Sequence, residues 1–238
     1  MSRINHPQLP LGFEPGELFT FDSFIAGPNT VATGLAQQLI RGEGESQLFF
    51  WGDSGLGKSH LLQASCNLAA KRQQSVCYLT AAQINGQAVE MFAGLETLDL
   101  LCLDELERWL VEPQWQLALF DLINRVRENG SRLIMAATQP PDVSFAQLPD
   151  LRSRLSWGPV FQLLPLSDED KYQALSYRAR QNGLELPRQV ADYLMQRYPR
   201  DMFGLFERLA LLDKASMAMQ RKLTIPLVKS VFGSENMA

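Results

Sequence analysis

One segment of the sequence, residues 52–59, has the residue types and spacing of a phosphate-binding loop. It fits the pattern G-x-x-x-x-G-K-[S/T] at every fixed position. Its glycines let main-chain N–H groups curl around phosphate oxygens, Lys58 can reach the β- and γ-phosphates, and the Ser59 hydroxyl can ligate Mg²⁺. The segment predicts a site for a nucleoside diphosphate or triphosphate with Mg²⁺ and leaves the base open. The residues expected at the nucleotide are Gly52, Asp53, Ser54, Gly55, Leu56, Gly57, Lys58, Ser59 and His60.

A second candidate group is the acidic pair Asp104 and Glu105, which directly follows the apolar run 98–103. Such a run is typical of a buried strand, and open α/β sheets place ligands at the carboxyl ends of their strands. Asp104 can hold Mg²⁺ through water, and Glu105 can orient or polarise an attacking water as a catalytic residue. Thr138 and Gln139 follow the next apolar run and can reach toward the γ-phosphate. An acidic pair alone is by default a solvated turn, but its place after the phosphate-binding loop favours function.

Two arginines, Arg152 and Arg154, lie close together in the segment 151–158. Such a pair is usually part of a solvated surface. An arginine directed at the phosphate of a neighbouring subunit has the same appearance in a single sequence. The residues alone therefore leave both interpretations open.

The elements that must position these groups alternate between strands and helices. Short apolar runs at 47–51, 76–80, 98–103, 133–137 and 160–164 predict buried strands. Segments 31–40, 59–72 and 114–127 carry apolar residues at helical spacing. This alternation predicts an α/β domain, residues 21–165, with a parallel sheet covered by helices on both faces.

The pattern changes after Pro165, where the strands stop and helices follow. Residues 167–170 predict a capping box at the start of a helix that ends near 182–183, and Thr224 is expected to cap a final short helix. Segments 187–198 and 202–212 carry the buried stripes of two more helices. We therefore expect a small all-α lid domain over 166–238, and an extended arm over 1–20, where prolines and glycines are interleaved with apolar residues.

Composition excludes several classes of function. The 238 residues include 22 Lys+Arg and 26 Asp+Glu, a net charge of −4, which argues against a bulk nucleic-acid binder. The three cysteines lack metal-ligand spacing and are expected to be reduced core residues. The two histidines, His6 and His60, are too far apart in sequence to suggest a histidine-based site. No apolar run is long enough to span a membrane and no signal pattern opens the chain, so we expect a cytoplasmic protein without a membrane partner.

Taken together, these motifs resemble the AAA+ module of the bacterial replication initiator DnaA. The resemblance rests on the phosphate-binding loop, the acidic strand end, the run 133–137 followed by two prolines, and above all Ser153-Arg154-Leu155-x-Trp157-Gly158. Residues 21–29 resemble the family segment that packs on adenine, which adds Phe24 to the expected nucleotide contacts and implies ADP or ATP. DnaA carries a further C-terminal DNA-binding domain, whereas this sequence ends soon after 224–232. In this respect the chain is similar to the Hda family of DnaA homologues.

The arm carries a further short match. Residues 8–13 fit the pattern Q-L-x-L-x-F by which bacterial proteins dock on the β sliding clamp. An extended peptide limited by proline loses little entropy on binding and offers apolar anchors to a groove. The alternative is a loose proline-containing tail. The expected clamp-binding residues are Gln8, Leu9, Leu11 and Phe13.

The resemblance implies a regulator. Hda proteins bind nucleotide, are held on the DNA-loaded clamp, and promote hydrolysis of the ATP bound to DnaA, which prevents a second initiation of replication. Arg154 then matches the family's arginine finger and counts as a catalytic residue, while DNA is contacted only through the clamp. Two departures bear on the chain's own hydrolysis: Phe203 stands at the family's sensor arginine, and Gln139 at its usual aspartate after the fourth strand. We expect tight diphosphate binding and slow or absent turnover.

Two other functions remain compatible with the residues. The intact Lys58, Asp104 and Glu105 also suit a self-contained AAA+ ATPase that acts as a helicase loader, although the clamp motif and the Trp157-Gly158 segment oppose it. The third is an assembly module in which nucleotide merely orders the lid. The oligomeric state is open, and a homo-oligomer is compatible with this sequence.

Overall fold

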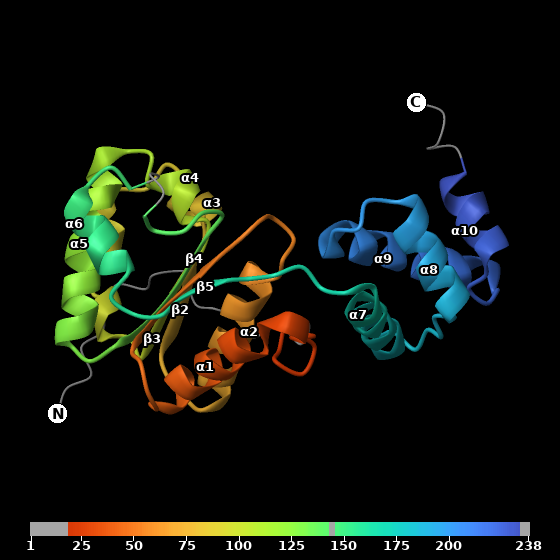
Figure 1. The fold of residues 1–238 in the computed structure, drawn as a ribbon, viewed down its shortest axis with the longest axis horizontal. Coiled ribbons are helices and arrows are strands. Elements are labelled where there is room, and N and C mark those ends of the chain that lie inside the picture. Colours follow the sequence, from red (N-terminus) through yellow and green to blue (C-terminus); the bar gives the residue numbers. More distant parts are fainter. Residues whose placement is uncertain (1–18, 143–145, 234–238) are drawn as a thin grey trace. The chain divides into compact units, whose positions relative to one another are not determined.

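The computed structural model describes residues 19–142 and 146–233, which divide into two compact units (Figure 1). The first unit contains Asn29–Leu164 and the segment that ends at Phe24, and the second contains Ile25–Pro28 and the chain from Pro165 onward. Most of the expected arm, with all four expected clamp-binding residues, lies outside the described part of the chain.

The first unit is built on a five-stranded parallel sheet in the order β2-β3-β4-β1-β5. Apart from β5, which is short and partly exposed, each strand is a nearly unbroken apolar run, as expected for strands covered on both faces. Because all strands run in the same direction, the chain leaves β1, β4 and β3 at one edge of the sheet. The strands are β1 (Gln47–Trp51), β2 (Val76–Leu79), β3 (Leu100–Leu103), β4 (Arg132–Ala137) and β5 (Val160–Gln162).

Helices cover both faces of this sheet, which confirms the predicted α/β architecture. Figure 1 shows α1 (Thr30–Arg41) and α2 (Lys58–Lys71) on one side and α5 (Pro113–Glu128) and α6 (Pro149–Leu155) on the other. Successive side chains of a strand point to opposite faces. Thus Leu101 and Leu103 join the cluster under α5, whereas the thiol of Cys102 lies 3.8 Å from the main-chain oxygen of Leu62 in α2.

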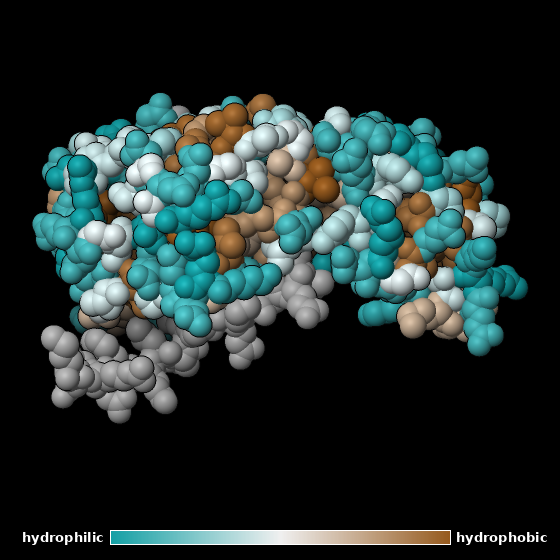
Figure 2. Space-filling model, turned by 90° about the horizontal axis from the view of Figure 1, so that it is seen from below, coloured by the Kyte–Doolittle hydropathy of each residue, from teal (hydrophilic) through white to brown (hydrophobic). Residues whose placement is uncertain are grey.

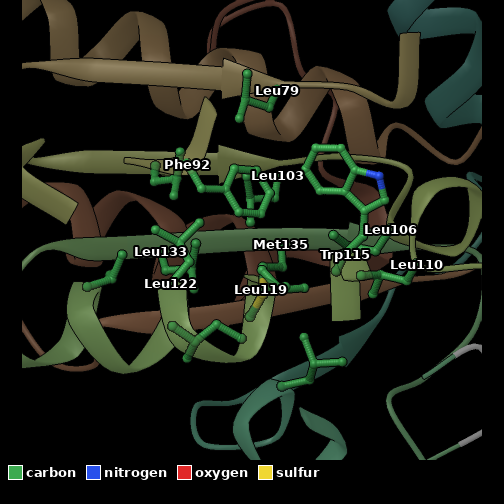
Figure 3. Close-up of a cluster of buried hydrophobic side chains, with 14 of the residues drawn as sticks. Leu79, Phe92, Leu103, Leu106, Leu110, Trp115, Leu119, Leu122, Leu133 and Met135 are labelled. Atoms are coloured by element: carbon green, nitrogen blue, oxygen red, sulfur yellow. The ribbon is translucent and has the colours of Figure 1, made fainter. Parts of the chain in front are cut away.

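The larger apolar core lies between the sheet and α5. Figure 3 shows Trp115, Leu119 and Leu122 of this helix packed against strand residues such as Leu103 and Met135. These helix residues recur every three or four positions, which is the spacing that predicted the helix. Leu119, Leu122 and Met135 are fully buried, so this face of the sheet is a rigid support for α5 and α6.

Several short helices escaped the sequence prediction, because segments of three to seven residues are too short to show an apolar periodicity. Two of them, α4 and α6, carry or flank candidate site residues. They are α3 (Ala81–Ile84), α4 (Leu106–Trp109), α6, and the 3-10 helices Gly27–Asn29, Val89–Phe92 and Leu95–Thr97.

The second unit is a bundle of four helices around its own core, which confirms the predicted helical lid. Both predicted caps are present: Ser167 and Asp170 form a capping box, and the Thr224 side chain accepts from the Leu227 N–H. Leu194 of α8, Leu209 of α9 and Val228 of α10 are buried together. The helices are α7 (Asp168–Gln181), α8 (Arg188–Arg197), α9 (Met202–Met219) and α10 (Ile225–Phe232).

The surface is mainly hydrophilic, with scattered hydrophobic patches. In Figure 2 hydrophilic residues surround separate hydrophobic patches. Among residues 19–142 and 146–233, no helix has the length and apolar character to cross a membrane.

Cys66, Cys77 and Cys102 are buried free thiols, and burial raises the pKa of Cys77 to about 12. The three cysteines are therefore reduced core residues, as predicted.

Candidate nucleotide-binding site

The phosphate-binding loop connects β1 to α2 and is shaped by its glycines. Gly52 and Gly57 have φ values of +143° and +92°, which other residues rarely adopt. A side chain at either position would also collide: a Cβ on Gly52 would lie 2.9 Å from the main-chain oxygen of Leu163, and one on Gly57 2.9 Å from the ring of Phe24. The loop ends at the amino end of α2, where N–H groups and the helix dipole favour an anion.

Lys58 is the first residue of α2, and its ammonium turns back into the loop. Nζ donates to the main-chain oxygens of Gly52 at 2.6 Å and Asp53 at 2.8 Å. Burial lowers the pKa of Lys58, and the negative charges of Asp104 and Glu107 partly offset that effect. A phosphate in the loop would supply the strong counter-charge that the two carbonyls do not.

Asp104 follows β3 and is held in one orientation. Only 2% of the residue is exposed. Its Oδ2 accepts from the Tyr78 hydroxyl at 2.8 Å, and its Oδ1 accepts from the Glu105 N–H at 2.9 Å. The carboxylate is therefore held in place by these two donors.

Glu105 is placed beside this group in an unusual conformation. Its backbone is left-handed, with φ 56° and ψ 40°, and its carboxylate forms an ion pair with Arg108 at 2.7 Å. The pair is exposed, so solvent screens it, it contributes little to stability and it opens readily. In this structure, however, the carboxylate predicted to act on water is directed to Arg108.

Two residues of the site were missed by sequence reasoning. Tyr78 is the next-to-last residue of β2. Its hydroxyl forms hydrogen bonds with Asp104, Gln63 and Ser59. Burial and the neighbouring Asp104 raise its pKa well above the ordinary value. Glu107 accepts from the main-chain N–H of Thr138 at 3.1 Å. Side chains of β2 alternate between buried and partly buried positions, and this pattern gives only a weak indication that Tyr78 belongs to the site. No sequence pattern around Glu107 indicates a role for it.

The segment before α1 packs on the start of α2 through His60. The rings of Phe19 and Phe24 each meet His60 edge-on at 5.2 Å, and His60 Nε2 lies 3.1 Å from the main-chain oxygen of Thr20. Phe24 is 8% exposed and touches the loop at Gly57. The structure thus brings Phe24 and His60, both expected at the nucleotide, together beside the phosphate-binding loop.

Arg154 lies apart from these groups, on α6, which packs with α5 against the opposite face of the sheet from α2. Its Nε donates to Asn124 Oδ1 at 2.9 Å, and its guanidinium lies 4.0 Å from the centre of the Trp157 ring. The guanidinium of Arg127 lies 4.2 Å from the same ring. Gln47 donates to the main-chain oxygen of Arg154 at 2.7 Å, so backbone and side chain are both fixed.

The residues present fit a metal ion that arrives with a nucleotide. Within 19–142 and 146–233, no group of three or more His, Cys, Asp or Glu could hold a metal on its own. Mg²⁺ in phosphate sites needs only one or two protein ligands, because phosphates and water supply the rest. Ser59 and Asp104 are joined through the Tyr78 hydroxyl and offer two such oxygens.

A parallel sheet with a phosphate-binding loop after β1, an acidic residue after β3 and a helical lid define a P-loop NTPase of the AAA+ class. The family "Bacterial DnaA ATPase domain" matches residues 16–162, and the family "Hda, lid domain" matches residues 168–232. The chain therefore belongs to the DnaA-like AAA+ family, with an Hda-type lid.

Solved structures agree on the fold. Domain III of the Thermotoga maritima replication initiation protein DnaA has a TM-score of 0.81 at 20% identity, covering 92% of this chain and 98% of that one. AMPPCP-bound DnaA from Aquifex aeolicus has a TM-score of 0.70 at 24% identity, covering 87% and 69%. The Thermotoga maritima RuvB Holliday junction motor has a TM-score of 0.72 at 18% identity, covering 92% and 73%.

Proposed function

We propose that this chain is a nucleotide-bound regulator of DnaA. Docked on the β sliding clamp, it promotes hydrolysis of the ATP on DnaA and so prevents re-initiation of DNA replication. The match of residues 168–232 to the Hda lid and of residues 16–162 to the DnaA ATPase domain supports this assignment. The observation that carries it is the arrangement of Arg154.

Arg154 has the geometry of an arginine finger that acts on another molecule. Its Nε is bound to Asn124 and its plane lies by the Trp157 ring, yet its two terminal nitrogens donate to none of the described residues. An arginine held this way presents a preorganised fork to an anion, whereas a solvated surface arginine needs no such support. Because α6 and α2 cover opposite faces of the sheet, the phosphate it meets belongs to a partner, which we propose is ATP on DnaA.

The chain's own nucleotide site serves binding more than turnover. We propose that it holds ADP or ATP, as DnaA from Aquifex aeolicus holds AMPPCP, with the loop amides and Lys58 on the phosphates. Phe24 and His60 adjoin the base, and Ser59 and Asp104 hold Mg²⁺, which neutralises phosphate charge when bound.

Three features support slow or absent hydrolysis by the chain itself. Glu105 is paired with Arg108, and Gln139 is exposed at the position where the family usually has an aspartate. Phe203 is 67% exposed at the position of the family's sensor arginine, and a phenyl ring cannot sense a γ-phosphate by charge.

Partners and location complete the proposal. Gln8, Leu9, Leu11 and Phe13 dock in the apolar groove of the clamp, and the net charge of −4 fits a protein that meets DNA only through the clamp. Such a protein acts in the cytoplasm.

A self-contained ATPase, resembling a helicase loader, is the second candidate. The gathering of Lys58, Asp104 and Glu105 at one edge of the sheet favours it, because these groups are what hydrolysis requires. The pairing of Glu105 with Arg108 counts against it.

One assay distinguishes the two. DnaA preloaded with labelled ATP is mixed with this protein, ADP and clamp-loaded DNA, and conversion to ADP is followed by single-turnover kinetics. The regulator predicts hydrolysis that requires the protein and the clamp together, with little turnover when DnaA is omitted. A loader predicts steady ATP turnover without DnaA, and that result would replace the proposal.

A further inference from the structure

The Tyr78 hydroxyl lies between two groups that the sequence assigned to the metal ion. It is 2.8 Å from Asp104 Oδ2 and is hydrogen-bonded to Ser59, and the Gln63 amide donates to it at 3.4 Å. The position follows from the sheet, because β2 pairs with β3 with Tyr78 opposite Cys102, two residues before Asp104. Tyr78 is partly buried, so its hydroxyl is directed into this group by the strand.

The direction of each hydrogen bond follows from the inventory of donors. The Tyr78 O–H donates to Asp104 Oδ2, because a carboxylate oxygen accepts. The single phenolic proton is then used, and Tyr78 can only accept from Ser59. The Ser59 hydroxyl therefore donates its proton to the hydrogen bond with Tyr78, and both lone pairs of the Ser59 oxygen can face a cation.

We propose that Tyr78 is a positioning residue for the Mg²⁺ of the bound nucleotide, acting by directing the Ser59 proton away from the metal and by fixing the Asp104 carboxylate. The inference rests on the nucleotide site of the proposed function and deepens it. In this role Tyr78 acts through Ser59 and Asp104 and not through a contact with the nucleotide. Its effect therefore belongs to the metal-dependent part of binding and leaves the contacts of the loop with phosphate unchanged.

Partners that orient metal ligands typically change metal affinity by about 10- to 100-fold when removed. A tyrosine that merely fills space at the end of β2 would be replaced by phenylalanine without such an effect. Tyr78→Phe keeps the ring and removes only the hydroxyl, so it separates the two roles. Tyr172→Phe is the matched control, because it removes a hydroxyl from α7 in the separate helical unit.

The test is calorimetric titration of the full-length protein with ADP, in Mg²⁺ and again in EDTA. We expect Tyr78→Phe to weaken ADP binding about tenfold in Mg²⁺ and less than twofold in EDTA, while Tyr172→Phe matches the wild type in both. Thermal denaturation of each variant verifies that it is folded. Equal ADP affinity of Tyr78→Phe and wild type in Mg²⁺ would overturn the proposal, and so would an equal loss in Mg²⁺ and EDTA.

A double-mutant cycle tests the route through Asp104. In an Asp104→Asn background, which already lacks the carboxylate, Tyr78→Phe should change ADP affinity in Mg²⁺ by much less than tenfold. Full additivity of the two changes would contradict the route through Asp104. If the wild type binds ADP in neither buffer, the nucleotide site fails. If it binds but Tyr78→Phe behaves as wild type, only the role of Tyr78 fails.

Discussion

Replacement of Trp157 tests how Arg154 is held. Two guanidiniums pack on the indole ring, that of Arg154 at 4.0 Å and that of Arg127 at 4.2 Å from the ring centre. Each such contact contributes about 0.5–1 kcal/mol at an exposed site. Trp157→Leu removes the ring but leaves the hydrogen bond between Arg154 and Asn124. Arg154 should thus lose about 1 kcal/mol of its preference for the presented orientation.

That loss corresponds to an approximately fivefold slower stimulated hydrolysis of ATP on DnaA, since about 1.4 kcal/mol is a factor of ten in rate. Trp157→Phe retains an aromatic face and should lie between Trp157→Leu and the wild type. The assay is single-turnover hydrolysis with clamp-loaded DNA present. Calorimetry with ADP should give wild-type affinity for both variants, because the ring lies on the α5 and α6 side of the sheet, opposite α2.

Trp157 also packs against the larger core, so Trp157→Leu is expected to lower the free energy of unfolding by about 2 kcal/mol. Thermal denaturation measures this separately from hydrolysis. If a folded Trp157→Leu protein stimulates hydrolysis as well as the wild type, the ring does not orient Arg154 and this reasoning is refuted.

Three further predictions concern the nucleotide, the sheet and the arm. Lys58→Met should weaken ADP binding at least tenfold in calorimetry, because a charge-assisted contact contributes about 1.5–3 kcal/mol, and unchanged affinity would refute the loop assignment. Asp99 accepts from the Ser75 N–H and hydroxyl, both at 2.7 Å, and these hydrogen bonds lower its pKa. A lowered carboxyl pKa stabilises the fold above the unfolded-state pKa, and this contribution disappears as the pH falls through the folded-state value. Asp99→Asn should therefore cost about 1 kcal/mol at pH ~7, with a difference in thermal denaturation that shrinks below pH ~4. Clamp binding in a pull-down should be lost, with unchanged melting temperature, when alanine replaces Gln8, Leu11 and Phe13, and retained binding would show that the motif match is accidental.

Much of the fold could be predicted because its signals are local. The phosphate-binding loop is one contiguous segment, each strand is a short apolar run, and the caps at Ser167 and Thr224 depend on residues three positions away. Apolar spacing in 114–127 anticipated α5 and the face it buries. Such features require no knowledge of which strands are neighbours.

The remaining parts of the site depend on contacts between distant segments. Tyr78 reaches Asp104 only because β2 pairs with β3, and Trp157 meets Arg127 only because α6 packs on α5. The pairing of Glu105 with Arg108 arises from a single-turn helix and a left-handed residue, for which the sequence offers no periodic signal. Motifs thus identified the chemical groups, and the sheet order determined their partners.

Replacement of Arg154 by alanine tests most directly whether this side chain acts on ATP bound to DnaA. Single-turnover hydrolysis of ATP on DnaA, with ADP and clamp-loaded DNA present, should fall at least about a hundredfold with Arg154→Ala, since such fingers contribute about 10³–10⁵ in rate. Arg152→Ala, on the same helix, is the matched control and should be milder. ADP affinity of both variants should stay near the wild type. Arg154→Ala should lower the free energy of unfolding by about 1–2 kcal/mol, because it removes the hydrogen bond to Asn124 and the contact with Trp157, and thermal denaturation measures this loss separately from hydrolysis. Unchanged hydrolysis on DnaA with a folded, ADP-bound Arg154→Ala protein would contradict the regulatory mechanism.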